Sequence, residues 1–230
     1  MNMINKYVKF IKELRNRRGF SQSDLAGKLG ISRPSYIAIE QGKRELTFSE
    51  AEKLSEVFGV SLKEMESGVS SNYEKYKQMI LAYIRNAGSK DGRITKTKLA
   101  KLVYLADFAW FYNHLESMSG MQYRKIQYGP VPDSYFRAID ELFEEGNIEI
   151  TPTEDGAMLI SQTRSGEKIA LSQINKDEEK LIRNISAKWK NKNTKEIVAF
   201  THNQLPYAVC LDNEIIPYEL ITQENPEDVY

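Results

Sequence analysis

The sequence predicts a mainly α-helical protein of two domains: a five-helix N-terminal domain, and a mostly helical α+β domain with a small β element. Apolar residues recur at helical spacing along most of the 230 residues. A small, polar stretch at residues 67–71 is typical of a flexible linker. Two short apolar runs, residues 148–151 and 157–160, flank Glu154-Asp155-Gly156 and predict a β-hairpin.

Residues 5–18 are expected to form the first helix. Tyr7, Ile11 and Leu14 share one apolar stripe, and lysines and arginines occupy the polar side. Residues 21–44 then hold two short amphipathic segments separated by Gly30, which is the plan of a helix-turn-helix. Glycine readily takes the positive φ that such a tight turn needs.

Capping residues mark the ends of these two segments. Ser21 is expected to cap the first helix with Asp24 as its capping-box partner, and Ser32 is expected to cap the second. Pro34 is tolerated in the first turn because the N–H that it lacks has no intrahelical partner there. Gly42 is expected to end the second helix.

This stretch resembles the Xre/Cro family of DNA-binding helix-turn-helix domains over about residues 5–66. The matching residues are Ser21, Gln22, Leu25, Ala26, Gly30, Ile31, Ser32, Ile39, Glu40 and Gly42. The resemblance implies that residues 32–41 form the recognition helix, whose first residues face base edges in the major groove. It also implies that Gln22 touches the DNA backbone, and that Arg15 and Glu40 form an internal salt bridge.

The expected contacts with operator DNA follow from this resemblance. They are Gln22, Ser32, Arg33, Ser35, Tyr36, Lys43 and Arg44. Many family members carry Gln or Asn early in the recognition helix, whereas this chain has Arg33-Pro34-Ser35-Tyr36, so the family does not define its operator. We expect the protein to bind as a homodimer.

The distribution of charge agrees with DNA binding. Residues 1–44 hold ten lysine and arginine residues against three acidic ones, a formal charge of +7. Residues 45–230 hold 22 against 29, which is −7, so the chain has zero net charge. A basic N-terminal segment on a neutral chain is the electrostatic pattern of phosphate binding.

Composition indicates the compartment. A hydrophobic content of 41% and a charged content of 28% are those of a globular protein. The single cysteine, Cys210, excludes an internal disulfide and fits a reducing cytoplasm. No apolar run approaches the roughly 18 residues of a membrane span, and residues 1–19 lack the apolar core of a signal peptide. We therefore expect a cytoplasmic protein that does not enter membranes.

The N-terminal domain continues to residue 66. Thr47 and Glu50 form the capping box of a fourth helix that ends at Gly59, and Ser61 and Glu64 open a short fifth helix. The expected domains are residues 1–66, a linker at 67–71, and residues 72–230.

Five further helices are expected in the second domain, over residues 73–86, 95–112, 177–190 and 194–203, and from Asp133 or Ser134 to Glu145. The helix at 95–112 is apolar nearly all round, which places it at the centre, and its Asp107 then needs a polar partner. The helix at 133–145 is expected to turn Ile139, Leu142 and Phe143 inward. Residues 205–230 are expected to pack partly as loop.

Residues 121–128 alternate between polar and apolar and are rich in aromatic and β-branched types, which predicts a strand or extended segment. Gly129-Pro130-Val131-Pro132 follows and is expected to be a rigid break in the chain.

The second domain resembles the Panacea, or SocA-like antitoxin, domain over about residues 75–217. The matching residues are Lys101-Leu102-Val103-Tyr104-Leu105-Ala106-Asp107, Gly120, Tyr123, Tyr128-Gly129-Pro130-Val131-Pro132 and Leu142. The resemblance implies an antitoxin of a type II toxin-antitoxin system, which binds and neutralises a cognate protein toxin. The DNA-binding domain at residues 1–66, called the head below, would let the protein repress its own operon as well.

The candidates for toxin binding are Asp107, Tyr123, Lys125, Tyr128 and Pro130. A structural role competes with this interpretation. Asp107 is a candidate for a buried acceptor that fixes the Tyr128-Gly129-Pro130 turn, and Leu102, Val103 and Trp110 are expected to be core.

The sequence argues against an enzyme. His114, His202 and Cys210 do not have the spacing of a zinc site, and there is no Gly-rich phosphate loop and no GxSxG motif. Cys210 and His202 could in principle form a nucleophile and base, although a lone buried cysteine and a surface histidine explain them better. No catalytic residue, metal or cofactor is expected.

Three functions stay open at this level. The first is an antitoxin that also represses its operon. The second is a plain transcriptional regulator from a phage or mobile element, whose second domain senses a ligand or dimerises. The third is an adaptor that delivers a bound partner to a protease. A toxin-like reading frame beside the gene favours the first, and an absent neighbour with many dispersed operators favours the second. Loss of partner protection only in cells that contain the protease favours the third.

Overall fold

The computed structural model divides the chain into two compact units, residues 1–71 and residues 72–230. It describes residues 8, 10–12, 14–16, 19–58, 62, 72–89, 91–154 and 156–230. The expected linker at 67–71 lies outside the described residues, as does the fifth helix apart from Leu62, which is helical. Each unit is described separately below.

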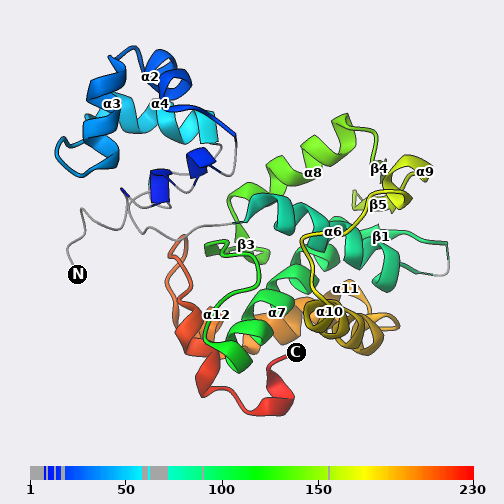
Figure 1. Cartoon of the computed structure of the whole chain (residues 1–230). Coiled ribbons are helices and arrows are strands. Elements are labelled where there is room, and N and C mark those ends of the chain that lie inside the picture. Colours follow the sequence, from blue (N-terminus) through cyan, green and yellow to red (C-terminus); the bar gives the residue numbers. More distant parts are fainter. Residues whose placement is uncertain are drawn as a thin grey trace. The chain divides into compact units, whose positions relative to one another are not determined.

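The first unit packs short helices around one small core. Residues 8, 10–12 and 14–16 are helical, as expected for the first helix. α2 (Gln22–Leu29), α3 (Arg33–Glu40) and α4 (Phe48–Phe58) follow (Figure 1). The buried apolar residues that meet in the core are Phe10, Ile11, Leu14, Leu25, Ala26, Leu29, Tyr36, Leu54 and Phe58. Burial of this set holds α2 and α3 in a fixed crossing.

The predicted caps of these helices are confirmed. The Ser21 hydroxyl accepts the Asp24 N–H at 3.1 Å, and the Asp24 carboxylate accepts the Ser21 N–H at 2.8 Å. Ser32 caps α3 by accepting the Ser35 N–H at 3.2 Å. Gly30 and Gly42 both have positive φ, 73° and 68°, so both turns use the freedom of glycine.

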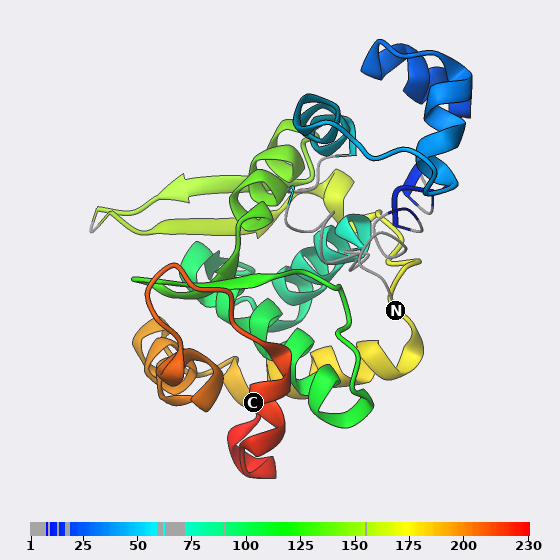
Figure 2. The same ribbon diagram turned by 90° about the vertical axis from the view of Figure 1, so that its left-hand side faces the viewer.

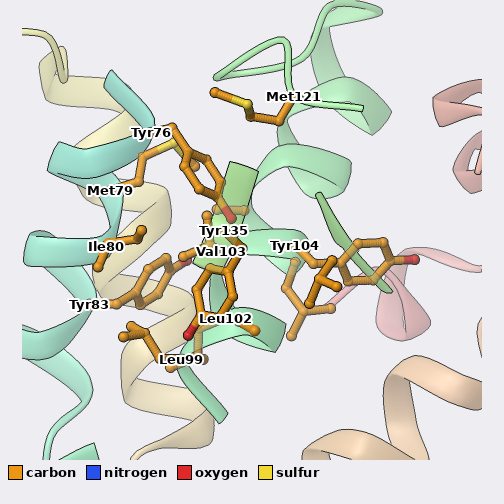
Figure 3. Packing of buried hydrophobic residues seen from close by; sticks show 14 of the residues in the cluster. Tyr76, Met79, Ile80, Tyr83, Leu99, Leu102, Val103, Tyr104, Met121 and Tyr135 are labelled. Carbon is orange, nitrogen blue, oxygen red and sulfur yellow. The ribbon is translucent and has the colours of Figure 1, made fainter. Parts of the chain in front are cut away.

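The second unit is a set of helices around α7 (Lys96–His114). Helices α6 (Tyr73–Ala87), α10 (Lys176–Trp189) and α11 (Thr194–Asn203) pack against α7, and the unit also contains α8 (Ser134–Glu144), α9 (Arg164–Glu167) and α12 (Leu205–Val209). Every residue of α7 from Lys98 to Trp110 is buried, which confirms its predicted central place. Figure 3 shows the tyrosines and aliphatic residues of α6 and α7 packed against one another, with Tyr135 and Met121 from the adjoining segments.

Two small antiparallel sheets complete this unit. In the first, β5 (Met158–Gln162) lies between β1 (Ile94–Thr95) and β4 (Ile148–Pro152). The predicted hairpin is therefore confirmed as β4–β5.

The second sheet corrects a prediction. Residues 129–132, expected to be a rigid break, form strand β3 (Gly129–Pro132), which pairs with β2 (Tyr123–Ile126). The other edge of β2 is also occupied, because the Lys125 N–H donates to the Glu214 carbonyl and the Ile216 N–H donates to the Tyr123 carbonyl. Prolines are tolerated in β3 because no other strand of the described residues pairs with the edge of β3 that faces away from β2, so the N–H groups that proline lacks are not needed there.

Two further expectations need correction. Phe143, expected on the inner face of α8, is 51% exposed, because the buried positions are Tyr135, Ala138, Ile139 and Leu142. The C-terminal segment is more ordered than a loop. It forms α12 and the 3-10 helices η1 (Tyr218–Gln223) and η2 (Pro226–Asp228), and it buries Ile216, Ile221 and Val229.

Candidate nucleic-acid interface and partner-binding unit

The first turn of α3 is presented to solvent. Ser32, Arg33 and Pro34 are exposed and Ser35 is half-buried, while Tyr36, Ile39 and Glu40 face inward. The Ser32 and Ser35 hydroxyls lie 2.8 Å apart. This turn thus offers a guanidinium, two hydroxyls and an apolar ring, which are groups that recognise base edges and phosphates.

A buried network fixes the orientation of α3. Arg15 Nε donates to Glu40 Oε1 at 2.6 Å, and Gln22 Nε2 donates to Glu40 Oε2 at 2.9 Å. The predicted Arg15–Glu40 salt bridge is therefore confirmed. Burial alone raises the pKa of Glu40, but the hydrogen bonds from Arg15 and Gln22 outweigh it and hold that pKa below its ordinary value. Gln22 was expected to contact the DNA backbone, but one N–H of its side-chain amide donates to Glu40 within the protein.

Tyr36 is withdrawn from the expected DNA contacts. Its side chain is fully buried in the first core, and burial raises the pKa of its hydroxyl far above the ordinary value. The helical period explains the error. Tyr36 is three residues before Ile39 and four before Glu40, so all three lie on the inward face of α3.

Arg44 has a different role from the expected one. Its guanidinium binds the Glu50 carboxylate with two hydrogen bonds, of 2.7 and 3.2 Å. Glu50 also accepts the Thr47 N–H at 2.9 Å, as the predicted capping box requires. Arg44 therefore ties the loop after α3 to the start of α4.

The helix also presents residues that the sequence reasoning did not select. Pro34 and Gln41 are exposed and Ala38 is half-exposed on the side of α3 away from the core. Their spacing of i, i+4 and i+7 places them on one stripe opposite Tyr36 and Ile39. The same helical spacing can be read from the sequence, so it could have identified Pro34, Ala38 and Gln41 as residues on the outward face of α3. Lys28, Arg33, Lys43 and Lys53 are the exposed cations of residues 19–58 that make no ion pair with the described residues.

In the second unit, Asp107 is a structural acceptor. It accepts the Ser119 N–H at 2.7 Å, the Ser119 hydroxyl at 2.5 Å and the Tyr123 hydroxyl at 2.8 Å. Burial raises the pKa of Asp107 to about 6, and the hydrogen bonds from Ser119 and Tyr123 oppose that rise. The predicted need for a polar partner is confirmed.

Three of the five expected toxin contacts are buried. Asp107 and Tyr123 are fully buried and Pro130 is buried within β3, so none of the three presents an exposed side chain. The sequence could not separate these roles, because a motif residue that supports a surface looks the same as one that forms it.

The other two residues do reach the surface. Tyr128, in the turn between β2 and β3, is 69% exposed, and Lys125 is half-buried with its Nζ donating to the Cys210 carbonyl at 2.9 Å. Val209 and Leu211, on either side of Cys210, are 55% and 75% exposed. The register of residues 213–216 along β2 brings Leu211 close to this turn. We call Tyr128, Lys125, Val209 and Leu211 the hairpin tip.

A close approach explains Gly129 in the Tyr-Gly-Pro motif. Its φ is 101°, and a Cβ at this position would lie 2.5 Å from Cε of Lys101 and 2.8 Å from Nε2 of His202. Lys101 is almost completely buried, and its Nζ donates to the Pro130 carbonyl at 3.3 Å. Desolvation lowers the pKa of Lys101 to about 7. A side chain at position 129 would therefore displace the groups that support the hairpin.

Cys210 does not have the surroundings of an activated nucleophile. Burial raises the pKa of the Cys210 thiol, the opposite of what an activated nucleophile needs. Among the described residues, no three His, Cys, Asp or Glu side chains are grouped to hold a metal ion. Within the same residues, no helix is long and apolar enough to cross a membrane.

Two protein-family models match the chain. Residues 11–65 match the model described as "Helix-turn-helix", and residues 99–206 match "Antitoxin SocA-like, Panacea domain". The second match contains α7 from Leu99 onward, both strands of the β2–β3 hairpin and the Lys101 and Asp107 sites. No solved structure matches the chain significantly.

Curated relatives resemble the N-terminal part. The chain is 31% identical over 88 residues to the uncharacterized HTH-type transcriptional regulator YqaE of Bacillus subtilis, covering 37% of this chain and 76% of the relative. It is 41% identical over 63 residues to an uncharacterized HTH-type transcriptional regulator of Methanocaldococcus jannaschii, covering 27% and 89%. It is 32% identical over 71 residues to the cryptic phage CTXphi transcriptional repressor RstR of Vibrio cholerae, covering 30% and 64%.

Proposed function

The chain belongs to the helix-turn-helix transcriptional regulators and carries an antitoxin SocA-like Panacea domain, and from this premise we propose that it is the antitoxin of a type II toxin-antitoxin system. In this proposal residues 72–230 bind a cognate protein toxin in the cytoplasm, and the head represses the operon. The observation that carries the proposal is the union of both domains in one chain.

The DNA-binding part rests on the first turn of α3. Arg33 is placed to read a guanine, since its guanidinium is exposed and has no ion-pair partner among the described residues. Ser32 and Ser35 supply hydroxyls, and Pro34 and Ala38 supply apolar contact for a thymine methyl group. Lys43 contributes a phosphate contact at the end of the helix. Gln22 keeps a second N–H for the DNA backbone.

The regulator acts as a homodimer in this proposal. Helix-turn-helix dimers place two recognition helices about 34 Å apart, on half-sites separated by one turn of DNA. The operator is therefore a palindrome with that spacing. Footprinting of the full chain on its own promoter tests this, and protection without two-fold symmetry counts against the dimer.

The antitoxin part is a matter of binding and not of chemistry. The second unit has its own core and offers the hairpin tip as a surface, and its buried Asp107 and Lys101 bond to groups within the unit. Tyr128 and Lys125 remain proposed toxin contacts. Neutralisation is steric: the antitoxin covers or distorts the toxin's active surface, across an interface of about 1,200–2,000 Å².

Co-expression with the product of the adjacent gene is the experiment that tests the proposal. A stable complex, together with relief of growth arrest, supports it. The similarity to a phage repressor favours a second candidate, a plain transcriptional regulator. That candidate prevails if the chain binds its operator but forms no complex with the product of the neighbouring gene.

A further inference from the structure

Helix α8 carries two faces of different chemistry. Tyr135, Ala138, Ile139 and Leu142 are buried against the rest of the unit. The outer side presents Phe136, Asp140 and Phe143, and we call these three residues the α8 stripe. Positions i, i+4 and i+7 of a helix lie one above another, so the stripe is continuous along about two turns.

The two phenylalanines of the stripe are exposed to an unusual degree for aromatic residues. Phe136 is 48% exposed and Phe143 is 51% exposed. Lys96 Nζ lies 5.1 Å from the Phe136 ring centroid and covers part of it. Phe143 has no such cover from an amine among the described residues. Exposed aromatic residues grouped on one helix face mark an interaction site more often than chance.

Asp140 and Phe143 of the stripe lie within an acidic region, residues 140–155. Residues 140–155 contain seven acidic residues and no basic one. Two of these, Glu141 and Glu145, pair with Lys77 of α6. Asp140, Glu144, Glu149 and Glu154 are exposed and make no ion pair with the described residues. In Figure 2 the β4–β5 hairpin, which carries Glu149, extends outward beside α8, so the acidic region continues from the helix into the hairpin.

The negative charge of this region restricts which class of partner can bind the α8 stripe. Nucleic acid and anionic lipid are both repelled by four unpaired carboxylates. A second copy of this chain is disfavoured as well. A two-fold contact that places Phe136 of one α8 against Phe143 of the other would bring the two Asp140 side chains together at its centre, and like charges at an interface are costly.

We propose that the α8 stripe is a docking surface for a basic protein surface, and that this surface belongs to the cognate toxin. The inference rests on the proposed antitoxin function and identifies the chemistry of the partner's contact. The partner provides an apolar recess for Phe136 and Phe143, and lysine or arginine side chains that pair with Asp140 and Glu144.

The test uses the full chain and the purified product of the adjacent gene, titrated by calorimetry. One variant reverses two charges, Asp140→Lys with Glu144→Lys, and a second removes the rings, Phe136→Ala with Phe143→Ala. The matched control makes the same charge change elsewhere, Glu219→Lys with Glu227→Lys, at exposed positions of the C-terminal segment. The altered residues are exposed, so all variants should keep the wild-type unfolding temperature and operator affinity.

We expect the Kd to rise at least about tenfold for the charge reversal and about tenfold for the ring removal, with less than about a twofold change in the control. Added salt should weaken wild-type binding more than binding by the charge-reversed variant.

Stripe variants that bind as tightly as the wild type overturn the inference, as does an equal loss in the control. Loss of self-association instead of toxin binding assigns the stripe to a second copy and also overturns it. A wild-type chain that fails to bind the neighbouring product overturns the proposed function itself, and the inference with it.

Discussion

The guanidinium of Arg15 lies 2.6 Å from the Glu40 carboxylate, and this ion pair joins the first helix to the last turn of α3. Gln22, the first residue of α2, donates to the same carboxylate at 2.9 Å. Residues from three helices therefore converge on one buried group. Because Arg15 and Gln22 both donate to the Glu40 carboxylate, the two hydrogen bonds fix the orientation of α3 and therefore the direction in which Arg33 and its neighbours face.

Replacing Glu40 by Ala should destabilise the head by about 2–3 kcal/mol, since it leaves the Arg15 charge partly buried and unpaired. Operator affinity should fall as well.

The same carboxylate makes the stability of the N-terminal unit depend on pH. The pKa of Glu40 is held below its ordinary value of 4.5, so the stability that ionised Glu40 adds to the folded unit is present above that pH and is lost as the pH falls through the lowered pKa. Thermal unfolding of residues 1–66 between pH 3 and pH 7 measures both effects. Glu45→Ala, at an exposed position, is the control and should change little.

Arg33 and Lys43 should differ in what their loss does to DNA binding. Arg33→Ala should cost about 1–3 kcal/mol and relax the preference at one base position, because a base contact is lost. Lys43→Ala should weaken all sequences alike and lower the salt slope by about one, because a phosphate contact is lost. Binding measured on a library of single-base operator variants at two salt concentrations separates the two. If Arg33→Ala binds all the operator variants with the wild-type base preference, Arg33 does not contact a base.

Gly129→Ala should destabilise the second unit more than Gly92→Ala does. Both glycines have positive φ, 101° and 75°, so both substitutions strain the backbone, at about 1–3 kcal/mol. Only at Gly129 would the new Cβ also meet Lys101, at 2.5 Å from its Cε, whereas at Gly92 nothing lies within 4 Å. Urea unfolding of residues 72–230 provides the comparison. Equal losses would show that Lys101 moves aside without cost.

Lys101→Met should stabilise the second unit at neutral pH. Desolvation lowers the pKa of Lys101 to about 7 from 10.5, so the folded state binds fewer protons than the unfolded state between these values. The wild type should therefore gain stability as the pH rises from 7 to 10.5, and the variant should lack that gain. Unfolding temperatures across this range measure it, with Lys180→Met at an exposed position as the control. A Met variant less stable than the wild type at pH 7 would mean that the charged form of Lys101 is stabilised in the fold.

Local patterns predicted much of the fold because the relevant forces act within a few residues. The caps at Ser21, Ser32 and Thr47 and the β4–β5 hairpin follow from short-range hydrogen bonding and turn chemistry. The β3 strand was missed although only two residues separate it from β2, because two of its four residues are prolines. A Gly-Pro-Val-Pro run carries no strand signal of its own.

The exposure of the expected site residues could be predicted only in part, for a related reason. Arg33 and Tyr128 are exposed, whereas Tyr36, Asp107, Tyr123 and Pro130 are buried. Family motifs include residues that support a surface along with those that form it. Phe136, Asp140 and Phe143 were missed because they match no motif, and their exposure depends on how α8 packs.

Growth rescue by the separate units tests the central claim most directly. Cells that express the toxin from the adjacent gene would receive residues 72–230 alone, residues 1–66 alone, or the full chain, each with a promoter reporter. Each unit has its own core, so both should fold alone. We predict that residues 72–230 restore growth without repressing the reporter, and that residues 1–66 bind the promoter without restoring growth. Rescue by residues 1–66 alone, or no rescue by residues 72–230, would contradict the antitoxin assignment.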